Sequence, residues 1–305
     1  MSLLAVGSIA FDSIRTPRGF AERVLGGSAT YFSLAASYFT PVEVVGVVGE
    51  DFTGEHEAVL TGRGIVTRGI ERAAGKSFFW SGEYEANPNV RHTLATELNV
   101  FERFQPKIPA AALGQPYLFL GNIHPELQCQ VSRQVKASVP GPRLVGGDTM
   151  NYWIANEPSR VREFLGQIDL LMINDGEALQ LSEDHNLPRA ARKILALGPK
   201  AVVIKRGEHG ATLYSREGCF GVPGYPLEDV WDPTGAGDSF AGGVMGYLAQ
   251  QSSVNGAALR KAVVYGSVMG SFACERFGVE RLTTLTPAEI EARYAEFVRL
   301  TQFHA

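Results

Sequence analysis

Chemically suggestive residues are concentrated in a ten-residue stretch that begins at Trp231 and reads Trp-Asp-Pro-Thr-Gly-Ala-Gly-Asp-Ser-Phe. Its proline, its two glycines and the small apolar residues that follow predict a turn that opens a helix. The first N–H groups of a helix lack a partner within it and lie at the positive end of its dipole, so the amides of Gly235, Ala236 and Gly237 form a candidate anion site. A carboxylate is unfavourable there unless it has a task, and Asp238 is suited to accept the proton of an attacking hydroxyl. The alternative is that Asp238 only caps the helix.

Two further groups are candidates for binding an acceptor. Asp12 follows the apolar run Leu3–Val6, at the strand end where α/β sheets bind ligands, and suits ligand hydroxyls. Gly26 and Gly27 precede the first expected helix, and a double glycine lets a ligand approach the backbone. Asp12 is equally well explained as a turn residue ahead of Pro17.

Residues suited to phosphate and metal come later in the chain. Asn174 and Glu177 lie where a strand passes into a helix. An amide and a carboxylate so placed suit a hydrated Mg²⁺ that carries phosphate oxygens, because Mg²⁺ keeps several waters and takes few protein ligands. The same spacing also predicts a helix capping box. Lys205 ends another strand and is followed by Gly207 and Gly210, which suits either nucleotide phosphate or a hairpin turn.

The elements that must position these residues alternate between strands and helices. Continuous apolar runs predict buried strands, and helical patterns separate them. The expected strands are 3–6, 42–48, 116–120, 143–145, 170–173 and 201–205, and the expected helices between them are 30–39, 126–139, 159–168 and 189–197. This alternation is typical of a mainly parallel sheet with helices on both faces. A hairpin over 211–222 is expected to close one sheet edge, and the last third of the chain is expected to be helical, with Pro287 in a first helical turn after Thr286.

One segment breaks the alternation. Residues 77–95 read as two strands joined by Asn-Pro-Asn, a hairpin inserted between helical units. Phe78, Trp80 and Tyr84 are expected to share one face of its first strand. Such an aromatic face suits a lid over a ligand or a homodimer contact, with plain packing on the main sheet as the alternative.

The amino-acid composition limits the kinds of partner that the protein can bind. The 305 residues carry a formal charge of -4 without long runs of like charge, which argues against nucleic acid and against a polybasic membrane patch. The three cysteines, Cys129, Cys219 and Cys274, are far apart and fit neither a zinc site nor a disulfide framework. No signal peptide and no membrane span is predicted. We expect a cytoplasmic protein with a small-molecule partner.

The order and spacing of these motifs resemble the PfkB, or ribokinase-like, carbohydrate kinase family over essentially the whole chain. Asp232 to Asp238 is similar to the family signature D-x-T-G-A-G-D, and the N-x-x-E of Asn174 to Glu177 supports the resemblance. It implies an α/β fold, a three-layer α/β/α arrangement whose mostly parallel central sheet carries a small β lid. It also implies one kinase domain over 1–305, with the lid hairpin around 77–95.

The resemblance implies a role for each motif. Asp238 would be the catalytic base, and the anion hole would consist of Gly235, Ala236 and Gly237. The acceptor would be bound by Asp12, Gly26, Gly27, Tyr31, Trp80 and His92, and ATP by Asn174, Lys205, Gly207, Gly210 and Thr234. Mg²⁺ would be held, largely through water, by Glu177 and Asn174, and Asp232 matches a position linked to K⁺. These parts suffice for phosphoryl transfer, which needs positioning and charge neutralisation more than covalent help.

Two departures from the family pattern affect the acceptor. Ala10 and Tyr31 stand where many sugar kinases of the family carry Asn, so recognition of a bare pentose should be weaker. With Trp80 and His92 on the lid, a nucleoside becomes an alternative acceptor. A phosphorylated sugar would need a basic clamp, for which Lys76, Arg91 and Arg103 are the nearby candidates. Asp148, in Asp-Thr-Met-Asn after a strand, has no assigned role.

The leading hypothesis is an ATP- and Mg²⁺-dependent kinase acting on a hydroxymethyl group of a sugar or sugar-like alcohol. A dinucleotide-binding oxidoreductase would need Gly-x-Gly-x-x-Gly after the first strand, and Gly7-Ser8-Ile9-Ala10 does not supply it; a Walker pattern is absent too. A sugar-binding regulator that has lost catalysis is the remaining alternative, although Asp238 and the anion-hole glycines argue against it.

Overall fold

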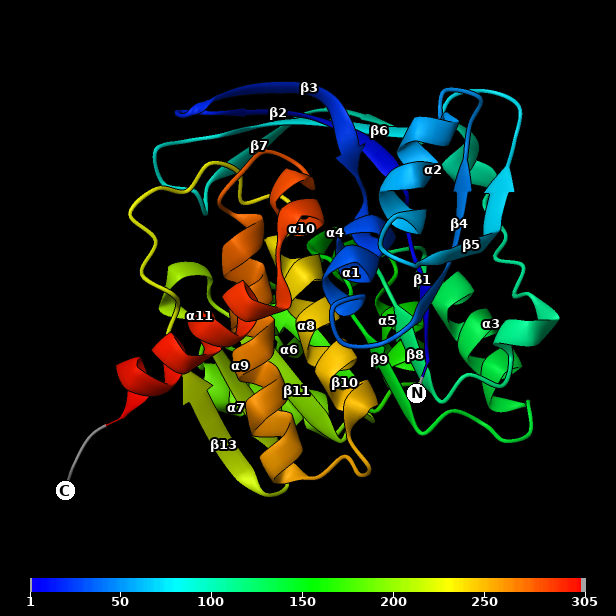
Figure 1. Ribbon diagram of the computed structural model, residues 1–305. Helices are drawn as coiled ribbons and strands as arrows, with labels where there is room; N and C mark the ends of the chain where they lie inside the picture. The colour runs from blue at the N-terminus through cyan, green and yellow to red at the C-terminus, as the bar shows by residue number, and fades with distance from the viewer. Residues whose placement is uncertain (1, 303–305) are drawn as a thin grey trace.

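The computed structural model describes residues 2–302, and its centre is a nine-stranded sheet in the order β13-β12-β11-β10-β9-β8-β1-β4-β5 (Figure 1). Neighbouring strands from β11 to β5 pair in parallel. Only β12 and β13 pair antiparallel with their neighbours, and these two strands form the hairpin predicted over 211–222. The strands are β1 (Leu3–Val6), β4 (Val42–Val48), β5 (Val66–Arg72), β8 (Tyr117–Leu120), β9 (Leu144–Gly147), β10 (Leu170–Asn174), β11 (Ala201–Lys205), β12 (Ala211–Ser215) and β13 (Gly218–Val222).

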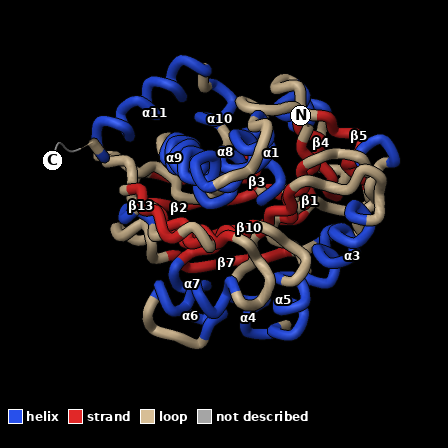
Figure 2. Tube along the Cα trace, turned by 90° about the horizontal axis from the view of Figure 1, so that it is seen from below, coloured by secondary structure: helices blue, strands red, loops and turns tan. Residues whose placement is uncertain are grey.

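Helices cover both faces of this sheet, which confirms the expected three layers (Figure 2). One layer holds α1 (Ser28–Ala36), α2 (Gly54–Thr61), α8 (Ala236–Gln250), α9 (Gly256–Ala273), α10 (Glu280–Thr284) and α11 (Pro287–Thr301). The other holds α3 (Pro125–Lys136), α4 (Asn151–Asn156), α5 (Pro158–Leu165), α6 (Asp175–Ser182) and α7 (Leu187–Leu195). Three short 3₁₀ helices, η1 (Asn99–Arg103), η2 (Ala110–Ala112) and η3 (Gly207–His209), lie in connections.

Strand β1 explains why continuous apolar runs mark this sheet. All four of its residues are buried, and successive side chains of a strand point to opposite faces. Leu3 and Ala5 enter the core under α1 and α8, whereas Leu4 and Val6 enter the core under α3 and α5. Both faces therefore demand apolar residues.

A second sheet of four strands, in the order β3-β2-β6-β7, forms the lid and lies across the top of the molecule in Figure 1. The predicted hairpin is present as β6 (Phe78–Tyr84) and β7 (Arg91–Glu97). The lid has a second hairpin that we did not predict, β2 (Ala10–Thr16) and β3 (Gly19–Gly26). The chain passes into it directly after β1, which places the lid over the carboxyl ends of the parallel strands.

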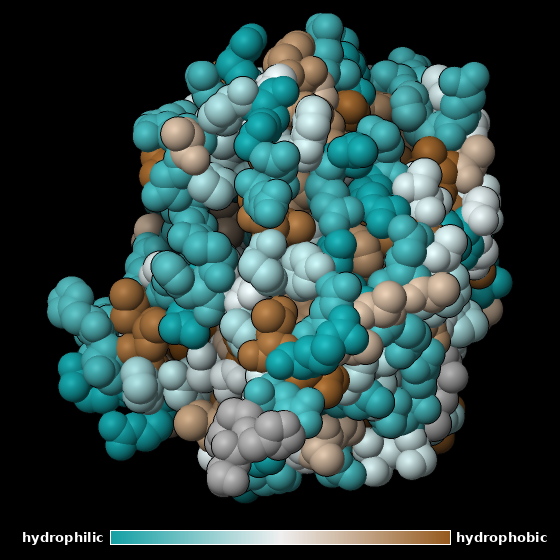
Figure 3. All heavy atoms as spheres, turned by 60° about the vertical axis from the view of Figure 1, so that its left-hand side comes forward, coloured by the Kyte–Doolittle hydropathy of each residue, from teal (hydrophilic) through white to brown (hydrophobic). Residues whose placement is uncertain are grey.

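The surface is mixed in character. On the face shown in Figure 3, polar side chains predominate and apolar ones form small separate patches. Within residues 2–302, no helix combines the length and apolarity needed to cross a bilayer. Exposed apolar residues on the lid, Phe20 of β3 and Leu94 of β7, lie on opposite edge strands of its sheet. A homodimer through the lid stays a prediction.

Candidate active site

The turn before α8 provides free backbone N–H groups, as the sequence predicts. Gly235 is the residue before the helix and has φ of 74°, a left-handed conformation that favours glycine. Across residues 2–302, no acceptor is found for the N–H groups of Gly235 and Gly237, whereas that of Ala236 donates to the Pro233 carbonyl at 3.3 Å. Two of the three expected anion-hole amides are therefore free in this structure.

Asp232 holds this turn in place. It is fully buried, and its two carboxylate oxygens accept N–H bonds from Thr234 at 2.8 Å and from Gly278 at 2.9 Å. Burial raises its pKa to about 6, and these two bonds oppose the rise. Asp232 thus has a structural task that needs no cation, and K⁺ dependence stays a prediction.

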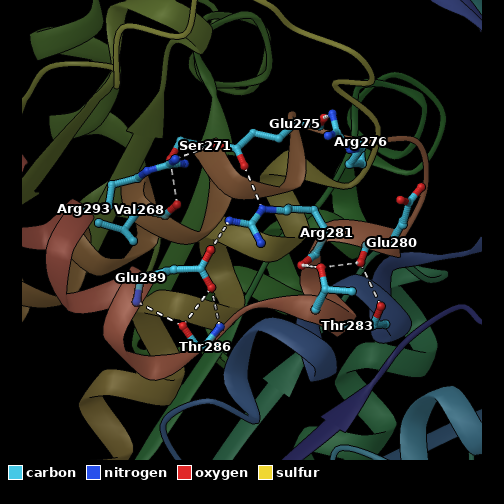
Figure 4. A network of polar contacts seen from close by, with 11 residues as sticks. Val268, Ser271, Glu275, Arg276, Glu280, Arg281, Thr283, Thr286, Glu289 and Arg293 are labelled. Atoms are coloured by element: carbon cyan, nitrogen blue, oxygen red, sulfur yellow. Dashed lines mark hydrogen bonds and ion pairs between the residues drawn. The ribbon is translucent and has the colours of Figure 1, made fainter.

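The segment that carries Gly278 is itself fixed by an ion-pair network (Figure 4). Arg281 of α10 pairs with Glu275 at 2.8 Å and with Glu289 of α11 at 2.7 Å, and Arg293 of α11 also pairs with Glu275. These pairs are partly buried, so solvent screens them less than it screens surface pairs. The network joins α9, α10 and α11 and so fixes the backbone around Gly278, whose N–H donates to Asp232.

Asp238 lies in the first turn of α8 and is partly exposed. Burial raises its pKa to about 6, and the charge of Lys205 opposes that rise. Lys205 ends β11, and its Nζ lies only 2.8 Å from the point where a Cβ on Gly237 would be. The ammonium therefore lies close to Gly237, and it makes no ion pair with any residue between 2 and 302. A carboxylate, a cation and free amides meet here.

Asp12 lies on the acceptor side, but in the middle of lid strand β2. Our expectation that it ends a strand of the main sheet is wrong, because the chain leaves that sheet at Val6. The carboxylate presses against Gly26, where a Cβ would lie 1.9 Å from Oδ2, and it accepts a bond from the N–H of Gly27. Gly27 has φ of 93° and no room for a Cβ beside Ser8. The double glycine is thus required to seat Asp12.

The acidic surroundings of Asp12 alter its ionisation. Asp12 is 4% exposed, and its burial, together with the charges of Asp232 and Asp238, raises its pKa to about 8. Protonated in this state, the group can donate as well as accept a hydrogen bond.

Tyr31 of α1 is buried in the same region. Its ring lies against Gly235, and its hydroxyl has no hydrogen-bond partner within the described residues. Burial raises its pKa well above the ordinary value, and Asp232 and Asp12 raise it further. A buried hydroxyl without a partner is unusual, which marks a position that an acceptor could satisfy.

The inner face of the lid carries aromatic groups. Trp80 pairs in register with Asp12 in the parallel β2–β6 ladder, so both side chains are on one face. Farther along β6, the Tyr84 hydroxyl bonds that of Thr234 at 3.1 Å. Thr16 of β2 also donates to the carbonyl of Trp231 at 2.9 Å. The lid is therefore closed on the catalytic turn.

His92 does not join the site. It follows Arg91 in β7, and Arg91 pairs with Tyr84 on the inner face, so His92 points to the opposite face. There its Nε2 contacts Glu85 at 2.6 Å, with more than half of each side chain exposed. The expectation that His92 binds the acceptor is wrong, because strand alternation turns it outward.

Asn174 and Glu177 form the capping box of α6. Asn174 Oδ1 accepts the N–H of Glu177, and Glu177 Oε2 accepts the N–H of Asn174, each at 2.8 Å. This does not remove Glu177 from the site. Burial raises its pKa, the charge of Lys205 opposes that rise, and the charge of Asp238 adds to it. The cap orients Glu177 and leaves its other oxygen available.

Asp148, to which we assigned no role, lies in this group too. It follows β9, is 7% exposed, and its Oδ1 has no hydrogen-bond partner among residues 2–302. Burial raises its pKa well above the ordinary value, and the charges of Asp238 and Glu177 raise it further. In the described part of the chain no three metal-binding side chains gather closely enough to hold an ion unaided. The orphaned carboxylate oxygen fits a Mg²⁺ that keeps most of its waters.

The nucleotide-side loop is compact. Gly207 has φ of 53°, and a Cβ on it would lie 2.4 Å from Oδ1 of Asn89, at the tip of the lid. Asn89 also donates to Glu208 at 2.6 Å. Gly210 has φ of 82° and lies against the Val222 carbonyl, where a Cβ would be 2.1 Å away. Gly210 is therefore required by the turn, and nucleotide binding by Lys205, Gly207 and Gly210 stays a prediction.

Comparisons with known proteins agree with this fold. A model of the pfkB family carbohydrate kinases matches residues 145–285. A cytidine kinase of Thermococcus kodakarensis is 28% identical over 252 residues, 80% of this chain and 87% of that protein. Plant fructokinases and an inositol 3-kinase also match, each over less than half of this chain.

Solved structures establish the fold. A nucleoside kinase of Burkholderia thailandensis in complex with inosine superposes with a TM-score of 0.77, at 22% identity, over 99% of this chain and 100% of that one. The aminoimidazole riboside kinase of Salmonella enterica, complexed with aminoimidazole riboside and an ATP analog, gives 0.77 at 18% identity over 96% and 100%.

The fold is that of the ribokinase-like phosphotransferases. More narrowly, residues 145–285 match the model of the pfkB family carbohydrate kinases, and the relatives that this chain resembles are named as kinases of nucleosides and sugars. A kinase of this kind implies ATP as the phosphoryl donor.

Proposed function

We propose that the protein transfers the γ-phosphoryl group of ATP to the primary hydroxyl of a nucleoside. One observation carries the choice of acceptor: Trp80 lies beside Asp12 on the inner face of the lid. A carboxyl group suits sugar hydroxyls, and an indole ring suits a flat, weakly polar group. A nucleoside has both parts. The relatives named as cytidine and nucleoside kinases support this choice.

The chemistry uses the groups at the start of α8. Asp238 takes the proton of the acceptor hydroxyl, whose oxygen forms the new bond to the γ-phosphorus while the bond to the β-phosphate oxygen breaks and ADP leaves. The free N–H groups of Gly235 and Gly237 point at the developing charge, and the helix dipole adds to their effect. Lys205 contributes a positive charge beside them.

The choice of metal ligands follows from the orphaned Asp148 oxygen and from the Glu177 oxygen that the capping box leaves available. Asp148 and Glu177, with Asn174 fixing the latter, would hold Mg²⁺ largely through water. When bound, Mg²⁺ neutralises phosphate charge. Dependence on K⁺ at Asp232 is tested by comparing rates in K⁺, Na⁺ and cation-free buffers; equal rates would contradict it.

The deciding experiment measures ADP release from ATP and Mg²⁺ with nucleosides, pentoses, hexoses, inositols and sugar phosphates. We expect a nucleoside to give the highest kcat/KM. The Asp238→Asn variant should be slower by about 10²–10⁴-fold, the usual contribution of a general base. The control is Asp175→Asn, which changes an exposed carboxylate of α6.

Two results would contradict the proposal. If a bare sugar is phosphorylated faster than every nucleoside, the nucleoside is not the acceptor, but the kinase activity itself is retained as the proposed function. ATP binding without turnover of any compound would favour a sugar-binding regulator.

A further inference from the structure

Arg91 is a cation on the inner face of the lid that the mechanism above does not use. It begins β7 and pairs with Tyr84 across the hairpin, and paired residues of antiparallel strands share a face. Tyr84 is the residue that bonds Thr234 of the catalytic turn. Arg91 is therefore held next to the point where the lid meets that turn.

Its neighbours fix the direction of the guanidinium. The Arg91 Cζ atom lies 5.4 Å from the centre of the Trp80 ring, and Trp80 flanks Asp12 in the β2–β6 ladder. The side chain thus extends along the inner face from Tyr84 towards the acceptor side, and it remains exposed.

Arg91 forms no ion pair with a neighbouring side chain among residues 2–302. Two other lid arginines, Arg18 and Arg23, pair with Asp229 and Asp51. For Arg91, no carboxylate lies within ion-pairing distance anywhere in the described stretch, 2–302. A cation held in place without an anion is available for a ligand.

The position of that charge lies between the two ends of the site. Burial raises the pKa of Asp12 and of Glu177, and the Arg91 guanidinium opposes both rises. Asp12 belongs to the acceptor side and Glu177 to the metal side, so the guanidinium is close enough to act on both. The phosphoryl group must pass between these ends, over Gly235 and Gly237.

We propose that Arg91 is a catalytic residue that binds the phosphoryl group during its transfer, as a charge that the lid supplies on closing. The proposal rests on the proposed kinase function but not on the identity of the acceptor. The guanidinium donates to the equatorial oxygens of the phosphoryl group opposite the amides of the turn, where charge develops as ADP leaves. An open lid removes this cation, so transfer to water is disfavoured before an acceptor is enclosed.

The test compares Arg91→Gln and Arg91→Lys with the wild-type protein, using the best acceptor of the panel above. We expect Arg91→Gln to lower kcat by about 10²–10³-fold, the range for loss of one donor to a developing anion, with both KM values changed less than threefold. Arg91→Lys should recover part of kcat. Arg15→Gln, which removes an exposed lid arginine that stacks on Phe20, is the matched control.

A second measurement does not depend on the acceptor. Binding of ADP with Mg²⁺ and aluminium fluoride, a mimic of the phosphoryl group in transfer, should weaken at least tenfold in Arg91→Gln, while binding of ADP alone stays unchanged. If wild type phosphorylates no nucleoside but another compound, the proposed acceptor fails and the Arg91 comparison is made with that compound. If Arg91→Gln keeps kcat and binds the mimic normally, the role of Arg91 is refuted. A raised KM confined to a phosphorylated acceptor, with kcat retained, would also refute it and make Arg91 a clamp for substrate phosphate.

Discussion

The ring of Tyr31 lies directly against Gly235, so closely that a Cβ on Gly235 would come within 2.3 Å of two ring carbons. Gly235 also has φ of 74°, which disfavours any side chain. Helix α1 and the catalytic turn are therefore fitted together through a glycine. The contact sets the height of the turn above α1 and hence the direction of the free N–H groups.

Replacing Gly235 by alanine should displace this turn. The change introduces both a clash and a strained φ, each of which costs about 1–3 kcal/mol. We expect kcat to fall by at least about 10²-fold and the melting temperature to fall measurably. Gly221→Ala is the control, because a Cβ there meets nothing within 4 Å. Steady-state kinetics and thermal unfolding of both variants check the prediction. Normal kcat in Gly235→Ala would show that the turn tolerates displacement.

Tyr31→Phe isolates the buried hydroxyl. Because that hydroxyl has no partner in the described residues, its removal should stabilise the ligand-free protein, by about 1 kcal/mol. If an acceptor supplies the missing partner, KM for the acceptor should rise about tenfold, which corresponds to the loss of one hydrogen bond of about 1.4 kcal/mol. Thermal unfolding and kinetics measure the two effects in one variant. Tyr152→Phe, at an exposed tyrosine, is the control. An unchanged KM would mean that the hydroxyl does not contact the acceptor.

Sequence patterns predicted the parts of this site that depend on local backbone rules. The turn at Gly235, the strand end at Lys205 and the Asn174 to Glu177 spacing all follow from glycine conformations and helix capping, which short stretches encode. The hairpin β2–β3 was missed because neither strand shows the usual alternation: β2 is buried on both faces, whereas most of β3 is exposed or only partly buried.

The roles of Asp148 and His92 needed three-dimensional information. Asp148 belongs to the site because β9 and β10 are neighbours, and register between distant strands is not visible in a short motif. His92 was misplaced because a bulge between Ser81 and Gly82 shifts the pairing of the hairpin, which decides the side chains that face inward. Pairwise register therefore limits what the sequence can predict.

The raised pKa of Asp238 predicts the acid limb of the rate profile. The base must be ionised, and its pKa is raised to about 6, so kcat/KM should fall about tenfold per pH unit below that value. The residual activity of Asp238→Asn should lack this limb. Binding of ATP to that variant over the same pH range corrects for ionisation of the nucleotide. A wild-type profile that stays flat down to pH 4.5 would contradict the assignment of Asp238 as the base.

The raised pKa of Asp12 predicts that the stability of the protein falls as pH rises, whereas kcat/KM rises with pH. In the folded protein its pKa is about 8, against about 3.9 in an unfolded chain, so the native state binds the extra proton between these values. Stability therefore falls as pH rises from about 4 to 8, by at most about 1.4 kcal/mol per pH unit for one group, and less here because Asp232 and Asp238 titrate together with Asp12. Asp12→Asn resembles the protonated form and removes this penalty.

We expect the Asp12→Asn variant to melt at a temperature that exceeds that of wild type by a margin that grows from pH 5 to pH 8 in metal-free buffer. Asp175→Asn, at an exposed carboxylate, should show no such growth. The same Asp12 variant should lose acceptor turnover, because an NH₂ group that only donates replaces a carboxyl oxygen that can also accept a hydrogen bond from an acceptor hydroxyl. Greater stability combined with lost turnover would identify Asp12 as a group retained for function at the expense of stability. A margin that is the same at both pH values would mean that Asp12 is already ionised in the folded protein.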